Sequence, residues 1–131
     1  MDELQRVMCV EDDPDIRMLL EFSLGRLGGY TLCMCASGNE ALDKAAVFAP
    51  HLVLLDVMMP GMSGPETLHH LRELDFMRGV PIVFLTAKTM QDELEVLQQH
   101  GATGIIVKPF KTVTLPKDIR IYWEHGRGIH T

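Results

Sequence analysis

The sequence contains no apolar run that approaches the roughly 20 residues of a membrane-spanning helix. It also has no excess of positive charge: 12 Lys and Arg residues stand against 18 Asp and Glu residues, which leaves a net charge of −6. Because nucleic acids are bound by basic faces, direct contact with nucleic acid is not expected. The first residues, MDELQR, are too polar and acidic to resemble a signal peptide. These absences predict a cytoplasmic protein that works away from membranes and nucleic acids.

Cysteine is scarce, and its positions do not suggest a disulfide framework. Cys9, Cys33 and Cys35 are odd in number and fall in apolar segments, which is typical of reduced thiols in a cytosolic protein. The pair at 33 and 35 resembles half of a metal site, but the sequence offers no second ligand pair nearby. We therefore interpret all three as small buried hydrophobic residues.

What the chain does contain is a regular alternation of short apolar runs and amphipathic segments. Its 131 residues, 47% hydrophobic and 23% charged, suit one domain with a single buried core. The apolar runs are continuous rather than alternating, which is typical of parallel strands covered by helices on both faces. The sequence thus predicts an α/β fold, a (βα)5 doubly wound five-stranded parallel sheet. The expected strands are 6–10, 30–35, 51–56, 81–86 and 104–107.

Capping residues mark the helices between these strands. Asp13, directly before a proline, predicts the start of a helix that continues to about residue 27. Ser37 and Ser63 each precede a glutamate by three residues, which is the capping-box pattern. The helices they begin are expected to end before Pro50 and near Leu74. Two more helices are expected at 89–100 and from about 115 to 124.

Polar side chains interrupt this pattern where the strands end. In an open parallel sheet, the carboxyl ends of the strands share one edge, and binding sites form there. Three carboxylates at one edge repel strongly, and a hard cation such as Mg²⁺ relieves that repulsion. Taken singly, most of these residues have plainer interpretations: a helix N-terminus, a strand end or a surface lysine. An acid that ends the most apolar strand is harder to explain, because burial penalises its charge. The residues are Glu11, Asp12, Asp56, Thr86 and Lys108.

Four segments together resemble the signature blocks of the response-regulator receiver domain of two-component signalling, in the CheY-like superfamily. They are MCVEDDPDIR, LVLLDVMMPGMSG, PIVFLTA and GIIVKPF, in the family's order and at its intervals. The resemblance covers essentially the whole chain, so residues 1–131 are expected to form one receiver domain with no effector domain in this chain. It implies a flavodoxin-like topology with strand order 2-1-3-4-5.

The resemblance also implies a role for each acidic residue. Asp56 matches the aspartate that attacks a phosphohistidine and carries the phosphoryl group as an acyl phosphate. Glu11 and Asp12 match the acidic pair that holds Mg²⁺ (or Mn²⁺), with Asp56 as a further ligand. Met58 matches the position whose backbone carbonyl binds the metal, so its side-chain type does not matter for that role.

Further positions match the phosphate pocket and the switch. Thr86 matches the hydroxyl that bonds a phosphoryl oxygen, and Ala87 matches the small residue beside it. Lys108 matches the lysine that contacts the phosphoryl group, and the bond to Pro109 is expected to be cis. Ile105 departs from the pattern, because many receivers place an aromatic residue there that moves with the threonine. A stiff β-branched side chain cannot perform that movement in the usual way.

The same resemblance implies the partners. The phosphoryl donor is expected to be a sensor histidine kinase or a histidine phosphotransfer protein. The protein is expected to switch protein–protein contacts rather than act as an enzyme, catalysing only its own phosphorylation and dephosphorylation. A monomer or a weak phosphorylation-dependent dimer is expected, and the sequence does not identify the downstream protein.

Three alternatives remain open at this point. The chain is equally consistent with a receiver fragment of a hybrid kinase or of a larger regulator. A Mg²⁺-dependent phosphatase similar to haloacid dehalogenases also uses an aspartyl nucleophile, but it needs a second acid where this chain has Met58. A flavodoxin-like module that binds a cofactor needs a Gly-rich phosphate loop, whereas EDDPD follows the first strand and would repel phosphate.

The six histidines are interpreted as surface or boundary residues rather than metal ligands. His69 and His70 are adjacent on an expected helix, and the sequence shows no third ligand that shares a face with both. The others lie at the ends of elements, at positions 51, 100, 125 and 130.

Overall fold

Five parallel strands form one sheet, as the sequence pattern predicted, in the order β2-β1-β3-β4-β5 that the receiver resemblance implied. The structure, a computed structural model, describes residues 3–87 and 99–126. Each strand lies within one residue of its expected position. The strands are β1 (Arg6–Val10), β2 (Thr31–Cys35), β3 (Leu52–Asp56), β4 (Ile82–Ala87) and β5 (Gly104–Lys108).

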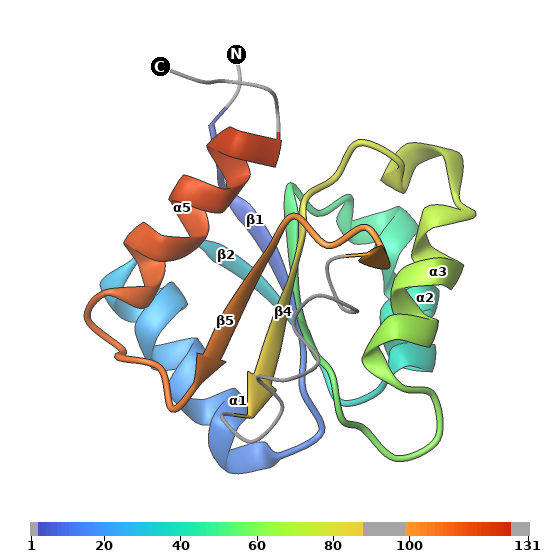
Figure 1. Ribbon diagram of the computed structural model, residues 1–131. Helices are drawn as coiled ribbons and strands as arrows, with labels where there is room; N and C mark the ends of the chain where they lie inside the picture. Colours follow the sequence, from blue (N-terminus) through green and yellow to red (C-terminus); the bar gives the residue numbers. More distant parts are fainter. Residues whose placement is uncertain (1–2, 88–98, 127–131) are drawn as a thin grey trace.

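Helices cover both faces of the sheet (Figure 1). One face packs against α1 (Pro14–Leu20) and α5 (Leu115–Gly126), and the other against α2 (Gly38–Phe48) and α3 (Gly64–Arg72). The expected single core is therefore two apolar clusters, one on each side of the sheet. Every residue of the central strand β3 is buried, which explains why its sequence is continuously apolar up to its last residue.

The predicted caps form the helix starts. The Asp13 carboxylate accepts a hydrogen bond of 2.8 Å from the Asp15 N–H at the start of α1. Ser63 and Glu66 make a complete capping box at the start of α3. Ser37 caps α2 in the same way, but the glutamate at position 40 reaches one residue further back, to the N–H of Ala36.

The first helix differs from its prediction in its second half. A continuous helix was expected to about residue 27, whereas α1 ends at Leu20 and a π-helix, η1 (Glu21–Leu27), follows. The wider turn is visible where the Gly28 N–H donates to the Ser23 carbonyl, five residues back, over 3.0 Å. The buried Ser23 hydroxyl donates a 2.6 Å hydrogen bond to the Thr112 carbonyl, which ties this turn to the chain before α5.

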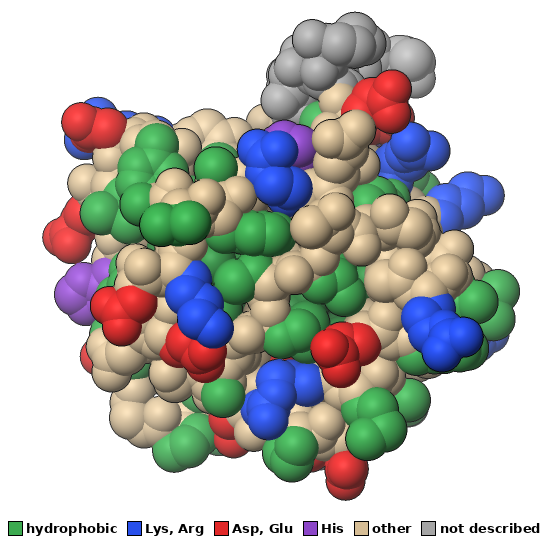
Figure 2. All heavy atoms as spheres, turned by 180° about the vertical axis from the view of Figure 1, so that it is seen from behind, with side chains coloured by type: hydrophobic (Ala, Val, Ile, Leu, Met, Phe, Trp, Pro, Cys, Tyr) green, Lys and Arg blue, Asp and Glu red, His purple; other side chains and the backbone are tan. Residues whose placement is uncertain are grey.

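Two further helical segments were expected or found in the connections of the sheet. A 3-10 helix, η2 (Asp75–Met77), follows α3. The helix expected at 89–100 lies mostly outside the described residues. None of the helices in the described part is long and apolar enough to cross a membrane. Seen from behind, acidic and basic side chains are interspersed among apolar ones over the surface (Figure 2).

The cysteines lie in the sheet as free thiols. Cys9 and Cys35 are buried, and Cys33 is partly exposed. The sulfur atoms of Cys33 and Cys35 are 3.9 Å apart. Burial, together with the neighbouring thiol, raises the pKa of Cys35 to about 12, so this thiol stays protonated and packs as an apolar group.

Candidate functional site: a carboxylate cluster with one lysine

The strand register brings the polar strand ends to one edge of the sheet. Asp56 on β3 is level with Leu85 on β4, and Ala87 on β4 is level with Lys108 on β5. On the other side of β3, Val10 at the end of β1 is level with Leu55 of β3. The residues that follow or end these strands therefore share the carboxyl edge, as expected for a parallel sheet.

Three carboxylates meet at this edge. The ligand oxygens of Glu11, Asp12 and Asp56 lie within 4.8 Å of one another, and within residues 3–87 and 99–126 they are the only such group of three. Glu11 is 1% exposed and Asp56 4% exposed, whereas Asp12 is partly exposed. Negative charges this close and this poorly hydrated repel one another strongly.

Lys108 is the positive charge of the cluster. Its Nζ lies 3.0 Å from Oδ1 of Asp56 and 3.0 Å from Oε1 of Glu11. Partial burial lowers the pKa of Lys108, but the two carboxylates outweigh this effect and raise it overall. The ammonium group is therefore held in its charged form between two acids.

One lysine does not balance three carboxylates. Burial raises the pKa of Asp56, the nearby Glu11 raises it further, and Lys108 opposes both, so that the pKa reaches about 6. Oε1 of Glu11 is within ion-pair distance of Lys108, yet it accepts no hydrogen bond of good geometry. A buried oxygen whose one cation is shared with Asp56, in a carboxylate cluster with excess negative charge, fits a hard cation such as Mg²⁺.

The other predicted site residues lie around this cluster. Thr86 is buried at the end of β4, and its hydroxyl donates a 3.5 Å hydrogen bond to the carbonyl of Ala87. Met58 lies in the loop after β3 with its side chain exposed. The bond between Lys108 and Pro109 is cis, as the resemblance implied.

Arg17 supports the acidic loop, and the sequence reasoning missed it. Its Nη1 donates hydrogen bonds of 2.9 Å to the backbone carbonyls of both Glu11 and Asp12. One guanidinium thus fixes the two consecutive peptides that carry the acidic pair. The only signal in the sequence is the spacing, since Arg17 lies one helical turn after Asp13.

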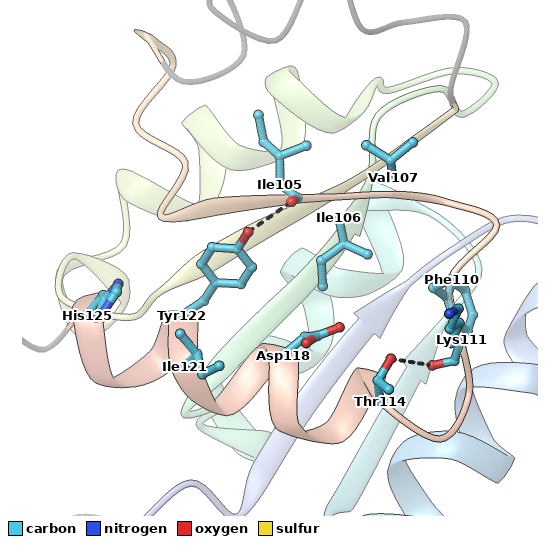
Figure 3. A pocket seen from close by; sticks show the side chains of 10 residues that line it. All are labelled: Ile105, Ile106, Val107, Phe110, Lys111, Thr114, Asp118, Ile121, Tyr122 and His125. Carbon is cyan, nitrogen blue, oxygen red and sulfur yellow. Dashed lines mark hydrogen bonds between the residues drawn. The ribbon is translucent and has the colours of Figure 1, made fainter.

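Tyr122 on α5 is a second residue whose contact the sequence did not predict, since packing inward and docking a partner both fitted its position. Its hydroxyl donates a 3.1 Å hydrogen bond to the backbone carbonyl of Ile105, on the outer edge strand of the sheet (Figure 3). The side chain of Ile105 points to the opposite side of β5 (Figure 3). Tyr122 lies against Gly104, where any Cβ atom would overlap the phenol ring. An aromatic side chain therefore does contact this strand, but it comes from α5.

Replacing Tyr122 by Phe removes that hydrogen bond and keeps the ring. We expect the free energy of unfolding to fall by about 0.5–1.5 kcal/mol, because the Ile105 carbonyl loses its donor. Urea denaturation measures the change. The control is Tyr30→Phe, since the Tyr30 hydroxyl makes a longer bond of 3.4 Å to the Pro116 carbonyl. An equal loss in both variants would contradict the expectation.

The protein is thus a parallel α/β domain with a carboxylate cluster and a lysine at the carboxyl ends of its strands. The family model of the response regulator receiver domain matches residues 7–120. The chain belongs to this family, which is the receiver of two-component signalling.

Several known proteins are similar to this chain. The DNA-binding response regulator MtrA of Mycolicibacterium smegmatis is 38% identical over 116 residues, which are 88% of this chain and 49% of that protein. The structure of chemotaxis protein CheY4 of Vibrio cholerae superposes with a TM-score of 0.84 at 32% identity, covering 92% of this chain and 99% of that one. The signal receiver domain of a Syntrophus aciditrophicus signal transduction histidine kinase gives a TM-score of 0.81 at 26% identity, covering 92% and 91%. The chain spans about half the length of the curated relatives it matches.

Proposed function

We propose that this chain accepts a phosphoryl group on Asp56 from a phosphohistidine donor and thereby switches protein–protein contacts in a cytoplasmic two-component or phosphorelay pathway. The observation that carries the proposal is the position of Asp56. It ends a fully buried strand, lies 3.0 Å from a lysine and shares one cluster with two further carboxylates. A rigid mount of this kind aims a nucleophile precisely.

In the proposed reaction, an oxygen of Asp56 forms a bond to phosphorus as the phosphorus–nitrogen bond of the donor breaks. Phosphoryl transfer depends mainly on positioning and charge stabilisation. Lys108, already 3.0 Å from Oδ1 of Asp56, remains beside the phosphoryl oxygens and neutralises charge on them. The Thr86 hydroxyl turns from the Ala87 carbonyl, which it bonds only weakly at 3.5 Å, and donates to a phosphoryl oxygen.

Glu11, Asp12 and Asp56, with the backbone carbonyl of Met58, are the residues proposed to hold Mg²⁺ or Mn²⁺. When bound, the ion supplies charge neutralisation to the carboxylates and the phosphoryl oxygens. Arg17 contributes by holding the backbone of the acidic pair.

The donor is proposed to be a sensor histidine kinase or a histidine phosphotransfer protein. The downstream partner differs with the context of this domain. MtrA is a DNA-binding response regulator, whereas the Syntrophus aciditrophicus receiver belongs to a histidine kinase. A receiver within a larger regulator and a receiver of a hybrid kinase are therefore both proposed contexts, and sequencing the complete reading frame decides between them.

Phosphorylation is tested with acetyl phosphate and Mg²⁺, followed by intact-mass measurement. The wild type is expected to gain one acid-labile phosphoryl group, and Asp56→Asn none. Asp13→Asn is the matched control, because Asp13 lies in the same loop and Asn also caps helices well. This control is expected to be modified like the wild type. An unmodified wild type, or a modified Asp56→Asn, would show that the proposal is wrong.

Turnover of a small phosphate ester tests the phosphatase alternative. Catalytic turnover by that mechanism needs an acid two residues after the nucleophile, and Met58 offers only an exposed thioether. We expect no multiple turnover of nitrophenyl phosphate under conditions in which Asp56 is phosphorylated. Sustained release of nitrophenol that depends on Asp56 would favour the enzyme.

A further inference from the structure

Two histidines from distant parts of the chain meet on the surface. His69 lies on α3, and His100 lies 31 residues later, directly before Gly101. Nε2 of His69 is 2.9 Å from Nδ1 of His100, and the rings are nearly perpendicular, at 76° with centroids 5.1 Å apart. His69 is exposed and His100 is partly exposed, so water and solutes reach the pair.

The distance between the nitrogens has a chemical meaning. Two ring nitrogens 2.9 Å apart share one proton, since one must donate and the other must accept. A tetrahedral ion bound at about 2.0–2.1 Å from each nitrogen would hold them about 3.3 Å apart. For one ion to replace the shared proton, the nitrogens need to separate by about a few tenths of an ångström, and the rings need to turn so that both lone pairs point at the ion.

We propose that His69 and His100 form a surface site for a divalent transition-metal ion of the Zn²⁺ or Cu²⁺ type, bound through Nε2 of His69 and Nδ1 of His100. Imidazole nitrogen suits these ions, whereas the all-oxygen cluster at Asp56 suits Mg²⁺. No third His, Cys, Asp or Glu of the described residues joins the pair. Two protein ligands and an open surface give modest affinity.

The site is separate from the phosphorylation site. The helix α3 begins near Asp56, because the N–H of Gly64 donates a hydrogen bond to the carbonyl of Val57. His69 lies further along this helix. His100 precedes the start of β5, whereas Lys108 ends that strand. An ion at the pair thus links α3 to the segment that enters β5, toward the opposite end of the sheet. Its binding requires no phosphoryl donor.

His70 provides a matched control. It follows His69 on the same helix, is also exposed, and has its Nδ1 3.4 Å from a carboxylate oxygen of Glu73 instead of another imidazole. If helix location and exposure alone sufficed for binding, His70 would contribute as much as His69. The proposed geometry assigns the binding to His69 and His100 only.

The test is calorimetric titration of the unphosphorylated protein with Zn²⁺ in millimolar Mg²⁺, which competes with Zn²⁺ for the carboxylate cluster. The wild type is expected to bind one equivalent. His69→Gln and His100→Gln are expected to weaken binding about tenfold or more, at least as much as the loss of an outer-shell partner does. His70→Gln is expected to bind like the wild type. Circular dichroism confirms that each variant is folded.

Electron paramagnetic resonance with Cu²⁺ reports the ligand atoms directly. We expect coupling to two imidazole nitrogens in the wild type and in His70→Gln, and a reduced nitrogen signal in the other two variants. The proposal is overturned if the wild type shows no saturable binding in Mg²⁺. It is equally overturned if all three glutamine variants bind alike, because the ion would then lie elsewhere.

Discussion

Replacing Lys108 by methionine is expected to lower the melting temperature of the metal-free protein by roughly 10 °C, a loss of about 3 kcal/mol or more. Lys108 lies 3.0 Å from each of two buried carboxylates. Methionine fills similar volume but leaves Glu11 and Asp56 without their cation. Removing one partner of a buried ion cluster lowers the free energy of unfolding by much more than the intact cluster adds to it, because uncompensated charge remains. Thermal unfolding with a chelator present measures the effect.

Asp56→Asn is expected to change the melting temperature in the opposite direction under the same conditions. Burial and the neighbouring Glu11 raise the pKa of Asp56 to about 6, so its charge destabilises the folded state at neutral pH. Removing that charge is expected to raise the melting temperature by several degrees. In the double variant, Lys108→Met is expected to cost less than it does alone, because one of the two orphaned carboxylates is gone.

The pH dependence of folding stability follows from the direction in which folding shifts the pKa of Asp56. The pKa of Asp56 rises from its ordinary value of 3.8 to about 6 on folding, so the folded state binds this proton more tightly than the unfolded state does. Stability contributed by this group therefore falls as pH rises from about 4 to about 6, and the full penalty applies above that. The advantage of Asp56→Asn over the wild type is expected to grow across this window and then level off.

The response to Mg²⁺ distinguishes two causes for the instability of Lys108→Met, namely uncompensated carboxylate charge and a simple packing defect. We expect Mg²⁺ to stabilise Lys108→Met more than the wild type, because the cation is the missing partner of the carboxylates. A packing defect would respond equally in both proteins. If Lys108→Met melts within a degree or two of the wild type in chelator, the cluster is not held together by this lysine.

Gly64→Ala is the second substitution with a large expected effect. Gly64 begins α3, and its N–H donates a 2.9 Å hydrogen bond to the Val57 carbonyl. A Cβ at this position would lie 2.8 Å from Cα of Val57 and overlap the backbone carbonyl of Asp56. Both obstacles are backbone, so no side-chain rotation relieves the overlap. We expect a loss of about 3 kcal/mol, at the upper end of overpacking effects.

The better helix propensity of alanine, about 0.5–1 kcal/mol, does not offset this overlap. Because the displaced backbone carries the nucleophile, phosphorylation by acetyl phosphate is also expected to slow markedly. Gly79→Ala is the control, since a Cβ at Gly79 meets nothing within 4 Å. It is expected to keep the wild-type melting temperature or exceed it slightly. Equal stability of the Gly64→Ala and Gly79→Ala variants would refute the close approach of α3 to Asp56.

Much of the fold was predictable because its signals are local. Continuous apolar runs predicted buried parallel strands, and caps such as Ser63 and Glu66 fixed where helices begin. The exception was the first helix, which becomes the π-helix η1 at Glu21. Within η1, the Ser23 hydroxyl donates to the carbonyl of Thr112, 89 positions away, and no local sequence pattern reveals such a contact.

The same division applies to the site. The residue types that end the strands can be seen in the sequence, and the geometry of parallel strands brings those ends to one edge of the sheet. Which side chains touch is visible only in the folded protein. Lys108 lies between Glu11 and Asp56, Arg17 donates to the backbone of the acidic loop, and Tyr122 donates to the carbonyl of Ile105.

The histidines show most clearly which contacts the sequence does not predict. In the sequence, His69 and His70 are equivalent neighbours, and His100 stands apart from both. In the structure, His69 faces His100 and His70 faces Glu73. Sequence spacing fixes the directions of neighbours along one helix, but contacts between helices and loops depend on how the whole sheet packs. That packing is a property of the entire chain, so only the folded structure reveals it.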